Sequence, residues 1–199
     1  MILEIPAEND PAVPDLWPSA FLGFTMMQNR VAIPAWSYAF EVLRPKNIIE
    51  LGTHEGGMSV LLAIAAMNYG AKFTTYDRSE TSPKWIWWFR SLSIDSRLRE
   101  DFMAESCLEE IKSSIRSPGV SVVLCDGGDK PREFRTLAEY LKPGDVIAAH
   151  DFMDHGSTVH WRSCEIQSKD VAQTCLDFNL VPWNHEIFEQ AAWLVKRKV

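Results

Sequence analysis

Three aspartates each stand at the end of a short apolar run that is typical of a buried strand. They are Asp77 after 72–76, Asp126 after 121–125, and Asp151 after 145–149. A fourth apolar run, 47–51, is followed by a glycine-rich loop over 52–57. Ligands of parallel sheets bind outside the carboxyl ends of the strands. We therefore expect the three carboxylates and the loop to face one common cleft.

The loop over 52–57 has neither of the two common phosphate-binding motifs. His54 stands where the dinucleotide fingerprint needs a glycine, and the Gly-Lys-Ser/Thr sequence of a P-loop is missing. Glycine still lets a ligand approach the backbone closely. Asp77 comes at the end of the next strand, where an acid can accept hydrogen bonds from ribose hydroxyls. Loop, strand and acid together favour a nucleoside ligand over a plain turn with two surface acids.

Two chemistries are open for Asp126, His150 and Asp151. Neighbouring strands lie about 4.8 Å apart, so the two aspartates could share a cation. Oxygen ligands suit Mg²⁺, and an imidazole shifts the preference toward Mn²⁺, Zn²⁺ or Fe²⁺. Alternatively, His150 is a general base with no metal present, because an unperturbed imidazole has a pKa of about 6.5.

Strand-like and helix-like patterns alternate along the chain, which predicts the elements that must position these residues. We expect strands over 47–51, 72–76, 99–103, 121–125 and 145–149, helices over 34–43, 58–69, 84–91, 107–115, 131–141 and 165–178, and a closing hairpin from 180–183 and 191–196. Such alternation predicts a Rossmann-like α/β fold, with a mostly parallel sheet of about seven strands and helices on both faces. A proline-rich N-terminal arm over 1–27 precedes this domain, which spans 28–199.

Composition narrows the class of protein further. The chain has 199 residues, 46% of them hydrophobic, which suits one globular domain. Its net charge of −7 argues against a nucleic-acid partner, and no apolar run is long enough for a membrane span. Four cysteines without a paired motif predict a reduced, cytoplasmic protein. Aromatic residues over 85–89 are consistent with packing or a homo-oligomer surface.

The glycine loop and its acid resemble a known family. Glu50-x-Gly52-x-x-x-Gly56 followed by Asp77 resembles the first motif and the following acid of class I S-adenosylmethionine (SAM)-dependent methyltransferases. The segments 124–129, 141–147 and 150–152 are similar to the cephalosporin hydroxylase-like and rhamnosyl O-methyltransferase family, so the resemblance covers about 28–152. His150 departs from that pattern, which has glutamate there.

The resemblance implies SAM as cofactor, with a divalent cation (Mg²⁺ or Mn²⁺) as an option, and methyl transfer to a hydroxyl of a small-molecule acceptor such as a sugar or natural product. It places at the cofactor Glu50, Gly52, Thr53, His54, Gly56, Gly57, Ser59, Asp77, Arg78, Glu105, Ser106 and Asp126. Catalysis, and the metal if one is used, fall to Asp126, His150 and Asp151.

Two other functions fit parts of the sequence. A nucleoside-binding or assembly module could keep the fold without catalysis, because a fold alone does not establish activity. A metal-dependent hydrolase could draw on His150, Asp151, Asp154 and His155, but it leaves the glycine loop without a role.

Overall fold

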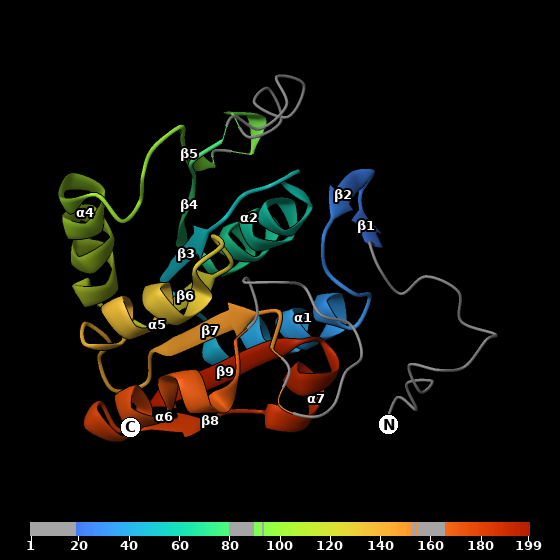
Figure 1. Ribbon diagram of the computed structural model, residues 1–199. Coiled ribbons are helices and arrows are strands. Elements are labelled where there is room, and N and C mark those ends of the chain that lie inside the picture. Colours follow the sequence, from blue (N-terminus) through green and yellow to red (C-terminus); the bar gives the residue numbers. More distant parts are fainter. Residues whose placement is uncertain (1–18, 80–89, 93, 153, 155–165) are drawn as a thin grey trace.

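The chain folds around one seven-stranded sheet with helices on both faces (Figure 1). The computed structural model describes residues 19–79, 90–92, 94–152, 154 and 166–199. Its strands are β1 (Ser19–Phe21), β2 (Phe24–Met26), β3 (Asn47–Leu51), β4 (Lys72–Asp77), β5 (Asp95–Leu98), β6 (Ser121–Cys125), β7 (Val146–His150), β8 (Leu180–Pro182) and β9 (Trp193–Lys198). Its helices are α1 (Ala32–Leu43), α2 (Gly57–Tyr69), α4 (Glu105–Arg116), α5 (Lys130–Ala138), α6 (Ser168–Asp177) and α7 (His185–Gln190).

The strand order in the sheet is β5-β4-β3-β6-β7-β9-β8. The five strands from β5 to β7 run parallel, and β9 is antiparallel to both β7 and β8. This confirms the predicted Rossmann-like α/β fold with about seven strands and an antiparallel pair that closes the sheet. The chain leaves β3 toward β4 on one side and returns to β6 on the other, so the strand order reverses between β3 and β6.

The apolar sequences of the central strands match their buried position in the sheet. Every residue of β3, β6 and β7 is buried, as is usual for parallel strands covered on both faces. Alternate strand residues belong to two separate cores. One core contains side chains of α1, α2 and α7, and the other contains side chains of α4, α5 and α6.

The predicted third strand over 99–103 was wrong. The structure has β5 at Asp95–Leu98, where all four residues are only partly buried. This edge strand is mostly polar, so it lacks the apolar signal by which buried strands are found. Phe102 suggested a strand, but its side chain is buried in the turn that follows β5.

Two further details concern connections. The closing strands β8 and β9 pair antiparallel as predicted, and the stretch between them contains the helix α7, whose Phe188 is buried in the core. The last part of the expected arm forms the β1–β2 hairpin, which packs on α2. Residues 1–18 of that arm, most of the helix expected over 84–91, and His155 fall outside the described residues.

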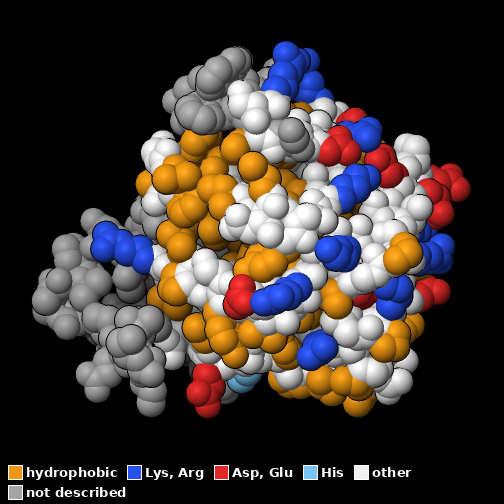
Figure 2. Space-filling view, turned by 180° about the vertical axis from the view of Figure 1, so that it is seen from behind, with side chains coloured by type: hydrophobic (Ala, Val, Ile, Leu, Met, Phe, Trp, Pro, Cys, Tyr) orange, Lys and Arg blue, Asp and Glu red, His pale blue; other side chains and the backbone are white. Residues whose placement is uncertain are grey.

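Hydrophobic and basic side chains gather on different parts of the face seen in Figure 2. Exposed large hydrophobic residues include Leu22, Tyr38, Val42 and Met67. Within the described part of the chain, no helix has the length and apolar character needed to cross a membrane.

Candidate functional site

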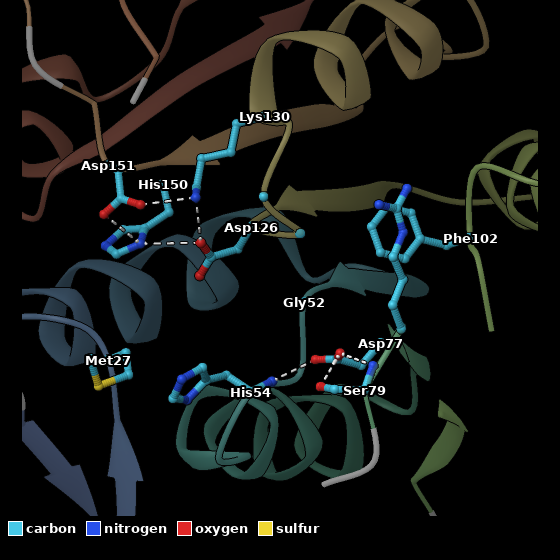
Figure 3. Close-up of a pocket in the computed structure, with 13 residues that line it drawn as sticks. Met27, Gly52, His54, Asp77, Ser79, Phe102, Asp126, Lys130, His150 and Asp151 are labelled. Carbon is cyan, nitrogen blue, oxygen red and sulfur yellow. Dashed lines mark hydrogen bonds and ion pairs between the residues drawn. The ribbon is translucent and has the colours of Figure 1, made fainter. Parts of the chain in front are cut away.

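A cavity of about 420 Å³ opens at the carboxyl ends of the strands, where the strand order reverses (Figure 3). Its size lies within the range usual for small-molecule sites. It is lined by Met27, Gly52, His54, Asp77, Arg78, Ser79, Phe102, Asp126, Gly127, Gly128, Lys130, His150 and Asp151. The structure therefore brings together seven of the residues singled out in the sequence: Gly52, His54, Asp77, Arg78, Asp126, His150 and Asp151.

Gly52 lets the loops after β3 and β6 meet at the floor of this cavity. Its φ is +94°, a left-handed conformation that favours glycine. A Cβ atom on Gly52 would lie 2.1 Å from the backbone oxygen of Asp126. The Asp126 N–H in turn donates a hydrogen bond to the Leu51 carbonyl. Only glycine fits here, and its position keeps the backbone at this point open to a ligand.

Glu50 lies beneath the cavity and is not among the residues that line it. Its Oε2 accepts hydrogen bonds from the hydroxyls of Ser59 and Thr75, and Thr53 is bonded to Thr75. All four side chains are buried. Burial raises the pKa of Glu50 to about 8, although the two hydroxyl donors act in the opposite direction. These residues support the glycine loop from below.

Asp77 ties the glycine loop to the end of β4. Its Oδ2 accepts a hydrogen bond from the His54 N–H at 2.8 Å, and its Oδ1 accepts bonds from the N–H and the hydroxyl of Ser79. A carboxylate offers about four acceptor positions. Three are used by these bonds, which leaves Asp77 capacity to accept from a ligand hydroxyl.

Arg78 and Phe102 form a flat wall beside Asp77. The Arg78 guanidinium lies 5.3 Å from the centre of the Phe102 ring and pairs with Asp101 at 3.0 Å. Phe102 was missed in the sequence because it was assigned to a strand. Phe102 is only 2% exposed, so the Arg78 guanidinium that lies over its ring is the plane on which a nucleobase could stack.

Seven of the expected cofactor residues are not in the cavity lining: Glu50, Thr53 and Ser59, which lie beneath the loop, and Gly56, Gly57, Glu105 and Ser106. Glu105 and Ser106 are exposed at the start of α4. Gly56, with φ of +81°, and Gly57 begin α2. A Cβ on Gly57 would lie 2.4 Å from the Thr25 carbonyl oxygen, so this glycine allows the β1–β2 hairpin to pack against α2.

Asp126, His150 and Asp151 meet at one side of the cavity. Their potential ligand atoms all lie within 4.8 Å of one another. Nδ1 of the buried His150 lies 3.3 Å from Oδ1 of Asp126 and 3.3 Å from Oδ1 of Asp151. Two flanking acceptors favour the tautomer with the proton on Nδ1. Burial by itself raises the pKa of Asp126, but His150 and Lys130 outweigh this and hold the pKa below its usual value.

Lys130 is a further cavity residue that the sequence analysis did not single out. Its Nζ lies 2.9 Å from Oδ2 of Asp151 and 3.3 Å from Oδ1 of Asp126, and its side chain is only 4% exposed. Lysine is rarely buried without a partner, and here it has two carboxylates. The sequence signal that could have indicated this ion pair is a lysine four residues after an aspartate, at the start of a helix.

Two further contacts fix the loop that carries Asp126. Gln28 donates a hydrogen bond to Oδ2 of Asp126 at 2.9 Å and accepts one from the Trp193 indole at 2.8 Å. The buried Glu133 carboxylate accepts bonds from the backbone N–H groups of Gly127 and Asp129. Burial raises the pKa of Glu133 to about 7. These contacts hold the loop after β6 in one position.

The Asp126–His150–Asp151 cluster is the one group of described residues with metal-ligand geometry. However, the same carboxylates already bind the Lys130 ammonium, and both are beside the Nδ1 of His150. A metal ligand nitrogen must be unprotonated. In this arrangement a cation from the chain, the Lys130 ammonium, already lies between the two carboxylates that a divalent cation would use.

No protein-family model matches this chain, and no curated protein does. Solved structures do match its fold. The apo structure of CmcI is 16% identical with a TM-score of 0.66, over 97% of this chain and 81% of that one. CmcI with Mg and SAM is 18% identical with a TM-score of 0.60, over 98% and 82%. The SAM complex of TomG, an O-methyltransferase from Streptomyces achromogenes, is 13% identical with a TM-score of 0.54, over 94% and 84%.

These likenesses concern the fold. The chain shares its fold with these structures of CmcI and TomG, which agrees with the fold implied by the resemblance of its glycine loop.

Proposed function

We propose that this protein is a SAM-dependent methyltransferase that acts on a hydroxyl group of a small molecule of the sugar or natural-product type. The observation that carries the proposal is the convergence of three features on one cavity. The backbone at Gly52, the Asp77 carboxylate and the Asp126–His150–Asp151 cluster all line it, at the reversal point of a sheet with the methyltransferase fold. Open α/β sheets bind their ligands at this point.

The glycine-loop side of the cavity suits the nucleoside part of the cofactor. The remaining acceptor capacity of Asp77 would bind a ribose hydroxyl, and the wall of Arg78 and Phe102 would hold the adenine. Gly52 and Gly128 leave their backbones uncovered toward the cavity. When bound, SAM supplies a methyl group on a positively charged sulfur, which leaves as a neutral thioether.

The opposite side of the cavity suits the acceptor. An alkoxide is a far better nucleophile than an alcohol, so the main tasks of the chain are to orient the hydroxyl and to remove its proton. We assign the proton to the Asp151 carboxylate, which lies beside the His150 Nδ1 and the Lys130 ammonium, and to Asp126 the orientation of the hydroxyl toward the methyl group. As the proton leaves, the oxygen–methyl bond forms and the sulfur–methyl bond breaks.

A divalent cation on Asp126, His150 and Asp151 is the other version of this mechanism, and one CmcI structure contains Mg together with SAM. The ion pairs of Lys130 support the version without a metal.

Isothermal titration calorimetry with SAM tests the proposal directly. Wild type should bind SAM, and Asp77→Asn should bind it at least about tenfold more weakly, the equivalent of roughly 1.4 kcal/mol. Asp95→Asn is the matched control, because Asp95 pairs with Arg97 and neither residue lines the cavity, so the affinity should change less than about twofold.

Transfer is measured separately, with SAM labelled in its methyl group and a panel of sugar and phenolic hydroxyl acceptors. Asp126→Asn should keep SAM affinity and lose transfer. Wild type that fails to bind SAM would refute the proposal. Binding without transfer to any acceptor would leave a nucleoside-binding module with the same fold.

A further inference from the structure

We propose that the Lys130 ammonium is a built-in counterion that takes the role of a divalent cation in the Asp126–Asp151 pair, so that cofactor binding and methyl transfer need no divalent metal. This inference rests on the proposed function and concerns the chemistry of the same cavity. Its geometry is shown in Figure 3, where the Lys130 side chain reaches from the start of α5 to both carboxylates.

The first support is that all four carboxylate oxygens are engaged by side chains of this chain. Oδ1 of Asp126 faces Lys130 and His150, and Oδ2 of Asp126 accepts from Gln28. Oδ2 of Asp151 faces Lys130, and Oδ1 of Asp151 faces His150. A divalent cation prefers carboxylate oxygens that can turn toward it. Of about four acceptor positions on each carboxylate, three are occupied on Asp126 and two on Asp151, so a divalent cation would have to compete with partners that are already bound.

The second support is the charge balance among these groups. The two carboxylates carry two negative charges, and Lys130 neutralises one of them from a position that is only 4% exposed. A divalent cation added beside the ammonium would bring three positive charges against two negative ones. Cations a few ångströms apart repel each other, and the repulsion is stronger beside protein than in bulk water. We therefore expect the metal and the ammonium to compete for the same two carboxylates.

The third support is that the backbone of Lys130 is held in place. Glu133 binds the N–H groups of Gly127 and Asp129, and the Asp129 carboxylate caps α5 by accepting from the Arg132 N–H. Lys130 is the first residue of α5, so its Cα position is fixed by these contacts. The cation is thus supplied from a rigid point of the fold.

Wild-type protein gives the first test, by Mn²⁺ binding measured with electron paramagnetic resonance and by SAM calorimetry in EDTA. We expect no saturable Mn²⁺ binding up to about millimolar concentration, and the same SAM affinity with EDTA as with Mg²⁺. Saturable Mn²⁺ binding in wild type that disappears in Asp126→Asn would overturn the inference.

Lys130→Met gives the second test, because it removes the ammonium but keeps a long side chain. The variant should melt at a lower temperature without metal, since two partly buried carboxylates lose their counterion. It should also gain a Mn²⁺ site. At Mn²⁺ one hundred times its Kd, the melting temperature should rise by about 5–10 °C.

Lys142→Met is the matched control. Lys142 also pairs with a buried aspartate, Asp145, at 2.8 Å and far from the cavity. Its variant should be destabilised without rescue by Mn²⁺, because among the described residues Lys142 forms an ion pair with one carboxylate, whereas Lys130 pairs with two. Equal rescue of both variants, or no rescue of a folded Lys130→Met, would contradict the inference. If Lys130→Met does not fold, the wild-type measurements decide.

The outcomes separate this inference from the proposed function. SAM binding that requires Mg²⁺ or Mn²⁺ would refute the role of Lys130 and keep the methyltransferase proposal. No SAM binding under any condition would refute the methyltransferase proposal, while the Mn²⁺ measurements would still report on the role of Lys130.

Discussion

The buried Glu50 should make the stability of this protein depend on pH in an unusual direction. Desolvation raises its pKa from 4.5 to about 8, so the native state binds this proton more tightly than the unfolded chain does. The contribution of Glu50 to the free energy of unfolding is therefore fully present below pH 4.5. It is lost as the pH rises from 4.5 to about 8.

The size of this loss follows from the gap between the two pKa values. At about 1.4 kcal/mol per pH unit, it amounts to about 3 kcal/mol at pH 7 and about 5 kcal/mol above pH 8. Glu50→Gln removes the titration and keeps an oxygen that can accept from Ser59 and Thr75. The variant should resemble wild type at pH 4.5 and be more stable at pH 8.5.

Urea unfolding of both proteins at several pH values between 4.5 and 9 measures this difference. Subtracting the wild-type free energy of unfolding from that of Glu50→Gln cancels other titrating groups, such as Glu133, whose pKa is also raised by burial. A difference that stays constant across this range would refute the assignment of a protonated Glu50 in the native state.

Three other substitutions test single features. Gly52→Ala should lower the free energy of unfolding by at least about 3 kcal/mol in urea, because its Cβ would meet the Asp126 carbonyl at a φ of +94°; stability close to wild type would disprove the close approach of the two loops. Gln28→Met should cost about 2 kcal/mol in the same assay, since it removes two hydrogen bonds of a buried side chain; no loss would mean that these bonds are not formed. Arg78→Ala should change stability by less than about 1 kcal/mol, because Arg78 and Asp101 are each more than half exposed; a larger loss in thermal melts would show that the pair matters more than its exposure suggests.

The sequence predicted the centre of the fold better than its edges. The buried strands β3, β6 and β7 are apolar along their whole length, and such runs are easily recognised. The edge strand β5 is polar, and its sequence shows no periodicity. Helix α7 is short and was hidden between two strands that do pair with each other. Short or edge elements depend on contacts that are distant in sequence.

The residues of the site could also be predicted only in part. Asp77, Asp126 and Asp151 could be placed together because the ends of parallel strands meet at one edge of a sheet. The contacts of Lys130 and Gln28 could not be inferred, because each depends on the direction of a long side chain. Glu50 was expected at the cofactor and lies below the loop, since its strand position faces α2 and β4 rather than the cavity.

The position of β9 has a consequence for how the chain matures during translation. β9 lies between β7 and β8 in the sheet, although it follows both in the chain. A nascent chain that has emerged as far as α7 therefore exposes the unpaired edge of β7, with His150 at its end. Exposed strand edges are sites of wrong pairing. Until residues 193–198 leave the ribosome, this edge of the sheet is unfinished, and chaperone binding to stalled chains should be strongest in that interval.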